Sequence, residues 1–256
     1  MRRGGAAVLA AAGGIALAAA VALASGGPER AAPELREPFA GRDRLLTNER
    51  AGRDRRAPRS SRWVVTSGSW FVRGGRGWTG VPDGDSPGCC SRRATGSAVL
   101  RVVTRRMQPA DVEVAFTLRA DRLVTTTRTP AQAYDGVHVF LRHRSERELY
   151  VASVGRRDGA IVVRKKLPGG PSNGGRYVDV GTRALRPIPF GVDRRVAVRV
   201  RDVPGGVGFR VLVDGVSVLA VTDPGAPGPL ITGRGRVGVR GDNADFRVDD
   251  IVVRGL

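Results

Sequence analysis

The sequence predicts an all-β fold, a two-sheet antiparallel β-sandwich behind an N-terminal signal or anchor segment. From Arg62 onward, short apolar runs alternate with Gly, Pro, Asp and Asn, a pattern typical of strands and turns. No 3.6-residue apolar period persists for more than two turns after the leader, so crossover helices and a parallel sheet are not expected. The 36 Gly and 16 Pro in 256 residues also favour tight turns over long helices.

Residues 1–24 have the features of a signal peptide. Arg2 and Arg3 form a positive n-region, residues 6–23 are almost uninterruptedly apolar, and Ala22-Leu23-Ala24 before Ser25 fits the small-x-small cleavage pattern. The alternative is an uncleaved membrane anchor, because the run approaches the roughly 20 residues needed to span a bilayer. We therefore expect a secreted, extracellular protein of the cell envelope that touches a membrane only through this segment, if the segment is retained.

The region after the leader predicts a linker and then one domain. Residues 25–60 are rich in Arg, Pro, Ala and Glu and lack sustained periodicity. Phe39, Leu45 and Leu46 interrupt this composition and favour a first strand that docks on the sheet. We expect a disordered linker over residues 25–43 and a single sandwich over residues 44–256.

Strict alternation of apolar and polar residues predicts half-buried strands at residues 112–118, 196–201 and 208–213. Asp214-Gly215 precedes another apolar run, and this dipeptide favours the type I′ turn of a hairpin. Further strands are predicted at residues 63–66, 69–73, 98–104, 136–143, 149–154, 161–167, 216–221, 237–240 and 246–254. Two antiparallel sheets packed face to face accommodate this set best.

The formal net charge of +19 raises nucleic acid or another polyanion as a partner. Lys165 and Lys166 are the only lysines among 43 basic residues, however, and such an arginine skew is expected of a GC-rich genome. The charge therefore does not predict a nucleic-acid partner. The two cysteines, Cys89 and Cys90, are adjacent, which excludes a disulfide framework between distant parts of the fold and any zinc-ligand spacing. A vicinal disulfide, pairing between chains and free thiols all remain open.

Four segments carry a family resemblance: "LLTNERA", "WVVTSGSWFVRGGRGWTGVPD", "DGVHVFLRHRSERELYVASVGRRDGAIVVRKKLPGGPSNGG" and "GRVGVRGDNADFRVDDIVVRGL". Over roughly residues 44–254 they resemble secreted actinobacterial proteins of the concanavalin A-like lectin/glucanase superfamily. The opening tryptophans and the closing strand are also similar to laminin G-like modules and the 3-keto-disaccharide hydrolase domain. The resemblance implies a jelly roll in which a concave sheet faces a glycan.

One predicted strand offers side chains suited to a sugar. Along residues 136–143, Val137, Val139 and Leu141 suit the core, so the alternate residues point to the other face. A surface that binds sugars needs exposed aromatic rings flanked by planar hydrogen-bonding groups. With contributions from neighbouring strands, the predicted ligand-binding residues are His138, Phe140, Arg142, Tyr150 and Lys165. The alternative is that these residues are ordinary sheet packing.

Catalysis is not expected by the glucanase mechanism, because the paired carboxylates of a Glu-x-Asp-x-x-Glu strand are absent. A non-catalytic extracellular glycan-binding module is the preferred interpretation. A polysaccharide lyase remains open, since His138, Arg142, Tyr150 and Lys165 are the residue types that neutralise a uronate and abstract its proton. The sequence is also compatible with a glycoside hydrolase on an acidic or neutral polysaccharide, and with an adhesion or structural domain of the envelope.

The resemblance also implies a structural calcium ion, because glucanases of this superfamily often link their first and last strands through one. Asp249 in "FRVDDIVV" matches the C-terminal ligand, and Glu49 is the candidate for the other. Backbone carbonyls would supply the remaining oxygens that calcium requires. Two solvated acids are the alternative.

Overall fold

The computed structural model describes residues 34–80, 99–127, 129–184 and 187–256. The predicted leader and the Cys89-Cys90 pair lie outside this part of the chain. Within it, no helix is long and apolar enough to cross a membrane. The regular elements are strands, with these bounds: β1 Leu35–Glu37, β2 Arg44–Asn48, β3 Trp63–Ser67, β4 Ser69–Arg73, β5 Arg76–Trp78, β6 Val99–Thr104, β7 Val112–Leu123, β8 Gly136–Ser145, β9 Glu148–Arg156, β10 Ala160–Ser172, β11 Gly175–Ala184, β12 Asp193–Val203, β13 Gly206–Val213, β14 Val216–Asp223, β15 Arg236–Asp242 and β16 Ala244–Gly255.

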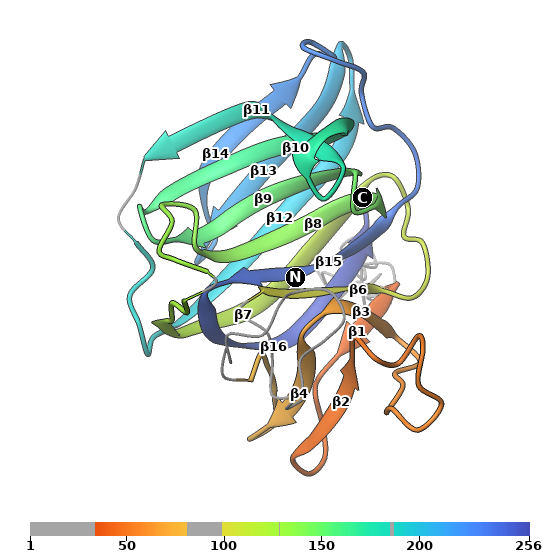
Figure 1. The fold of residues 1–256 in the computed structure, drawn as a ribbon. Coiled ribbons are helices and arrows are strands. Elements are labelled where there is room, and N and C mark those ends of the chain that lie inside the picture. Colours follow the sequence, from red (N-terminus) through yellow and green to blue (C-terminus); the bar gives the residue numbers. More distant parts are fainter. Residues whose placement is uncertain (1–33, 81–98, 128, 185–186) are drawn as a thin grey trace, which may run out of the picture. The chain divides into compact units, whose positions relative to one another are not determined.

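These strands form two antiparallel sheets that pack face to face, which confirms the predicted all-β sandwich (Figure 1). One sheet has nine strands in the order β14-β13-β12-β7-β16-β5-β4-β2, with β1 paired to β16. The other has seven strands in the order β11-β10-β9-β8-β15-β6-β3. In Figure 1 the seven-stranded sheet faces the viewer, so the outer face of this sheet is the surface seen in that orientation.

The core lies between the sheets, and the period of two along each strand builds it. Phe116 and Leu118 of β7 are fully buried in it, as are Val196 and Val198 of β12. The predicted alternation is thereby confirmed for these strands. The predicted hairpin is also present: β13 pairs with β14, and Asp214 and Gly215 have φ values of 49° and 81°. These positive angles are those that a type I′ turn requires.

The segment before the expected sandwich is more ordered than predicted. Residues 35–37, assigned above to a disordered linker over residues 25–43, form β1 and pair with the closing strand β16. Phe39 is fully buried and packs edge-on against Trp70, with ring centroids 5.6 Å apart. Glu37 accepts a hydrogen bond of 3.1 Å from the indole nitrogen of Trp63. A strand of three residues is too short to produce a periodic signal, which is why composition alone indicates a linker.

The strand β11 is not among the predicted strands. It pairs with β10 across a turn in which Asn173 and Gly174 have φ values of 49° and 73°. Its sequence, GRYVDVGTRA, mixes Gly and charged residues with few apolar ones, because β11 is an edge strand of the seven-stranded sheet. This hairpin places Tyr177 on the outer face of the sheet, opposite Lys166 of β10.

Candidate functional site

Up to Leu141, the side chains of β8 point to the inner and outer faces that the sequence predicts. Val137, Val139 and Leu141 belong to the core between the sheets. Phe140 lies in a separate cluster on the outer face with Val103, Leu149 and Val151, where it is only 1% exposed. Phe140 is therefore a packing residue and not an exposed platform for a sugar. His138 shares its face, opposite Ser153 of β9.

Arg142 does not follow this alternation. Its φ of 46° coincides with a register irregularity between Leu141 and Ser145 of β8, and the bulge turns its side chain away from the outer face. The guanidinium binds Asp202 of the other sheet at 2.8 Å and the carbonyl of Ile231 at 3.0 Å. The expectation that Arg142 lies beside His138 and Phe140 is wrong for this reason.

Tyr150 and Lys165 also face inward, so their expected place on the ligand face is wrong. Tyr150 is paired with Leu141 and with Lys165, and all three occupy the inner face of their sheet. The Tyr150 hydroxyl donates to Asp223 at 2.7 Å, and the Lys165 ammonium lies 3.0 Å from the same carboxylate. Burial, together with the nearby Asp223, raises the pKa of Tyr150. The side chains of Tyr150, Lys165 and Asp223 form a buried network in the core.

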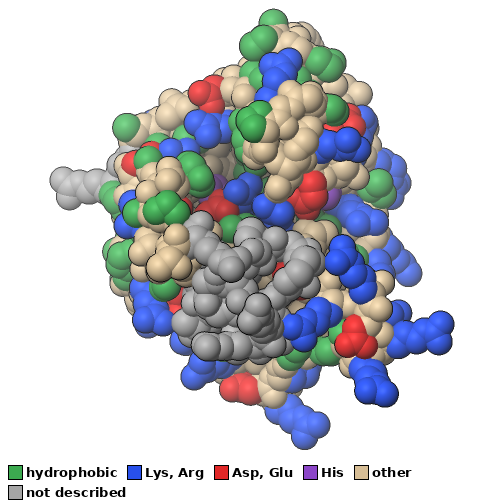
Figure 2. Space-filling view, viewed as in Figure 1, with side chains coloured by type: hydrophobic (Ala, Val, Ile, Leu, Met, Phe, Trp, Pro, Cys, Tyr) green, Lys and Arg blue, Asp and Glu red, His purple; other side chains and the backbone are tan. Residues whose placement is uncertain are grey.

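A hollow of about 180 Å³ opens on the outer face of the seven-stranded sheet. Figure 2 shows Lys, Arg, Asp, Glu and His side chains that gather on this face. We call this feature the outer-face hollow, and ten residues line it: Tyr134, His138, Val151, Ser153, Arg156, Arg164, Ser172, Tyr177, Arg240 and Asp242. Of the five predicted ligand residues, only His138 is among them.

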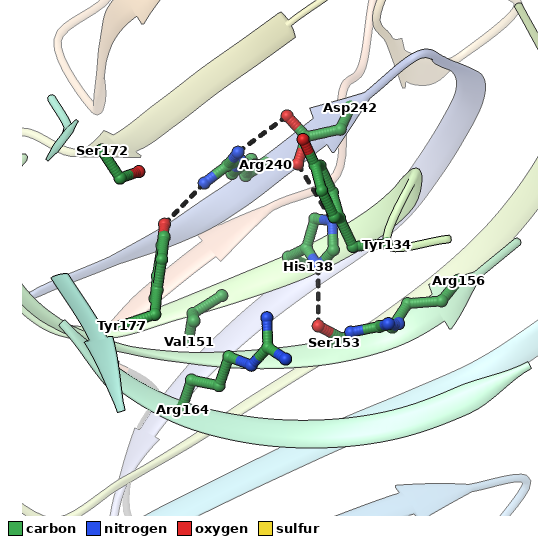
Figure 3. A pocket seen from close by; sticks show the side chains of 10 residues that line it. All are labelled: Tyr134, His138, Val151, Ser153, Arg156, Arg164, Ser172, Tyr177, Arg240 and Asp242. Carbon is green, nitrogen blue, oxygen red and sulfur yellow. Dashed lines mark hydrogen bonds and ion pairs between the residues drawn. The ribbon is translucent and has the colours of Figure 1, made fainter. Parts of the chain in front are cut away.

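A connected chain of polar groups crosses the hollow (Figure 3). His138 Nδ1 lies 2.8 Å from the Ser153 hydroxyl, and Nε2 lies 3.1 Å from the Asp242 carboxylate. Arg240 binds Asp242 at 2.9 Å and donates to the Tyr177 hydroxyl at 2.8 Å. Each member holds its neighbour in one orientation, so the floor of the hollow is rigid.

Burial and ion pairing determine the charge states of His138 and Asp242 in this series of polar groups. Burial lowers the pKa of His138, which favours the neutral ring. Burial opposes the charged form of Asp242, but the Arg240 guanidinium and His138 outweigh it and lower the pKa of this carboxyl. A neutral histidine protonated at Nε2, the atom that lies 3.1 Å from the Asp242 carboxylate, accepts a hydrogen bond from the Ser153 hydroxyl at Nδ1. The resulting arrangement is a neutral histidine held between a carboxylate and a hydroxyl.

Two arginines that line the hollow have donor nitrogens without a hydrogen-bond partner among the described residues. Arg156 binds Asp158 through Nε and Nη2, whereas its buried Nη1 has no hydrogen-bond partner among the described residues. Arg164 donates from Nε to Asp179 at 2.5 Å, the only hydrogen bond of its side chain within the described ranges. In Figure 3 the Arg164 guanidinium points between Tyr177 and Tyr134, which stand on opposite sides of the view.

A second charged cluster shares the outer face. Glu146 lies 3.6 Å from Arg101 and accepts a hydrogen bond of 2.8 Å from Thr66. Burial opposes the charge of Glu146, but His143 and Arg101 outweigh it and lower its pKa to about 2. Lys166 lies 5.1 Å from the centroid of the Tyr177 ring, and burial, with Arg240 nearby, lowers its pKa to about 8. These ionic groups extend the polar surface beyond the hollow.

Glu49 and Asp249 do not fit a shared calcium ion. Glu49 directly follows β2, Asp249 lies in β16, and β5 and β4 separate these two strands in the sheet. Three interstrand spacings amount to roughly 14 Å, whereas calcium binds oxygens at about 2.3–2.6 Å. Glu49 instead accepts a hydrogen bond from the Gly68 amide at 2.6 Å. The described residues contain no group of three or more acidic, His or Cys side chains able to hold a metal.

The sequence signals for the hollow are distributed over several strands. Arg240 and Asp242 alternate with the core residues Val237 and Val239 of β15, so the period of two places both on the outer face. Tyr177 lies in the edge strand that the strand pattern misses, and Tyr134 lies in the loop before β8. Only the pairing of the strands brings these residues to His138.

No protein-family model matches this sequence, and the search of curated proteins finds no match. Solved structures do match. A Bacillus subtilis protein of unknown function with a galectin-like fold covers 89% of this chain and 97% of its own, at 14% identity and a TM-score of 0.57. The fold is a concanavalin A-like jelly roll.

Two further structures share this jelly roll. Carbohydrate-binding module CBM66 from Bacillus subtilis has a TM-score of 0.50 at 12% identity and covers 75% of this chain and 95% of its own. The VIP36 exoplasmic/lumenal domain, in a form bound to Ca²⁺ and Man3GlcNAc, has a TM-score of 0.50 at 13% identity and covers 76% of this chain and 84% of its own. At these identities the likeness establishes the jelly-roll fold, and function must be argued from the site.

Proposed function

We propose that this chain is an exported glycan-binding β-sandwich module and that the outer-face hollow holds the sugar. The observation that carries the proposal is the pair of tyrosines around the hollow, with arginine guanidinium groups between them. Tyr134 is 43% exposed, so its ring is free to stack on the apolar face of a pyranose. Planar guanidinium groups supply directed donors to the hydroxyls of the ring. Carbohydrate-binding neighbours of the same jelly-roll fold support glycan binding, and the leader predicted at residues 1–24 is the reason to propose export.

Within this proposal the module is non-catalytic. Among the described residues, Asp242 is the only carboxylate that lines the hollow, and hydrolysis by paired carboxyl groups requires two. The lowered pKa of Asp242 also keeps it ionised and unsuited to act as a general acid. The lyase interpretation loses support, because Arg142, Tyr150 and Lys165 lie away from His138, whose two ring nitrogens both face protein groups.

A glycan array on the secreted protein tests the proposal. Tyr134→Ala should weaken binding of the best glycan about fivefold to tenfold, because it removes one stacking ring without disturbing the core. Phe190→Ala is the matched control: it removes an aromatic residue that is 55% exposed but lines a different cavity. An array on which no glycan binds would favour an adhesion or structural role. Unsaturated products that absorb in the ultraviolet would favour a lyase.

A further inference from the structure

The charged groups that line the outer-face hollow are unbalanced: two arginines have donor nitrogens without a partner among the described residues, whereas the carboxylate of the lining is engaged. The Asp242 carboxylate is engaged by Arg240 and His138, and the Ser153 hydroxyl is engaged by His138. The lining, as far as the chain is described, contains no Asn or Gln side chain. Arg156 Nη1 has no partner among the described residues, and Arg164 uses only Nε there. Guanidinium groups donate and never accept.

A neutral sugar satisfies this pattern only in part. Its hydroxyl groups both donate and accept, and the hydroxyls of Tyr134, Ser172 and Tyr177 can accept from them, but a neutral hydroxyl does not offset the charge of the arginines. A carboxylate or sulfate group accepts only, and it carries the charge that the arginines require. An unpaired cationic donor in a buried position is costly, and an oxyanion is the group that satisfies it best.

The local charge is consistent with this pattern. In the described part of the chain, three arginines line the hollow against one aspartate. The acidic partners of two of them lie outside the lining: Asp158 for Arg156 and Asp179 for Arg164. Asp179 is well exposed, with 67% of its side chain accessible, so solvent screens its charge more strongly than charges inside the hollow.

We propose that the outer-face hollow selects an acidic glycan, in which the sugar residue bound between Tyr134 and Tyr177 carries an oxyanion held by Arg164 and Arg156. This inference rests on the proposed glycan-binding function and names its ligand class. Arg164 reaches the ligand as a fork, and Arg156 supplies a further guanidinium donor in the same lining (Figure 3).

The first experiment compares acidic and neutral ligands on the full chain by isothermal titration calorimetry. The probes are trigalacturonate, its fully methyl-esterified form, a sulfated galactan oligosaccharide and the neutral glucan laminarin. We expect the acidic probes to bind at least about tenfold more tightly than the esterified form, because esterification removes only the charge. The carboxylate and sulfate probes distinguish the two sources of the oxyanion. Affinity should fall as ionic strength rises.

The second experiment separates the hollow from the general positive charge of the protein. Arg164→Gln should weaken binding of the acidic probe about tenfold, since it removes a charge-assisted donor. Arg164→Lys should recover only part of this loss, because lysine keeps the charge but not the fork. Arg210→Gln is the control: it removes the same charge from an exposed position in β13 of the other sheet and should leave affinity unchanged.

Three results would overturn the inference. Equal loss in Arg164→Gln and Arg210→Gln would assign binding to non-specific charge. The protein could bind trigalacturonate and its ester with equal affinity, or prefer laminarin, and lose this binding in Tyr134→Ala. Either result would refute selection of acidic glycans and leave the proposed glycan-binding function intact. Failure of every glycan, neutral and acidic, would refute the proposed function itself.

Discussion

At the scale of single residues, the most informative group is Asp223. Its carboxylate, 1% exposed, accepts from Tyr150 of β9 and lies beside Lys165 of β10, while Asp223 itself ends β14 of the opposite sheet. The Lys165 ammonium also donates to the carbonyls of Gly228 and Pro229, which satisfies its three protons. Tyr150 and Lys165, which suggest a ligand site in the sequence, thus link the two sheets through Asp223, by a hydrogen bond and an ion pair.

Removing this carboxylate should destabilise the fold. Asp223→Asn leaves the Lys165 charge buried without its counter-ion and should cost about 3–5 kcal/mol of unfolding free energy. Urea denaturation measures this loss. Asp179→Asn is the matched control, because it removes a carboxylate from an exposed ion pair and should cost less than about 1 kcal/mol. A similar small cost for both variants would show that the buried link contributes no stability.

At the scale of the elements, β8 supports two apolar clusters. Its inner residues join the core between the sheets, whereas Phe140 fills the outer cluster with Val103, Leu149 and Val151. Gly238 lies opposite Phe140 on β15, and a Cβ there would come within 2.0 Å of the Val102 carbonyl oxygen. The close approach of β15 to its neighbouring strand at Gly238 therefore lies beside the large ring of Phe140 on the outer face, next to the hollow.

Both faces of β8 should therefore be sensitive to truncation. Val139→Ala should cost about 2 kcal/mol, and Phe140→Ala about 3 kcal/mol, because each empties a closed cluster. Chemical denaturation gives both values. The sequence pattern alone predicts that Phe140→Ala weakens glycan binding with little loss of stability, and the burial of this ring reverses that expectation. A tolerated Phe140→Ala would contradict the packing role.

At the scale of the whole molecule, the closing strand β16 receives β1 on one side, so the N-terminal residues help to complete the nine-stranded sheet. The predicted cleavage after Ala24 leaves β1 on the mature chain. We propose Ser25 as its first residue, and mass spectrometry of secreted material checks this. Met1 still attached to membrane-bound protein would instead indicate an anchor.

Truncation tests the role of this segment directly. A chain that begins at Gly41 lacks β1 and Phe39, and it should lose about 3–5 kcal/mol relative to a chain that begins at Ser25, chiefly from the buried Phe39 ring. Melting temperatures of the two chains, measured side by side, give the comparison. Equal values would support the assignment of residues 25–43 as a linker.

The sequence by itself determined the fold class and most strands, because the period of two and the turn residues are local signals that each strand carries alone. It also determined to which face the side chains of residues 137–141 point, because Val137, Val139 and Leu141 alternate with the other residues. Only the tertiary structure decided the site. Whether Tyr150 faces inward depends on which residue of β8 it pairs with. The side chain of Arg142 changes direction at a β-bulge that the sequence pattern does not predict. The outer-face hollow joins Tyr134, Arg164, Tyr177 and Arg240 from separate strands and loops, and strand pairing, a non-local property, is what brings them together.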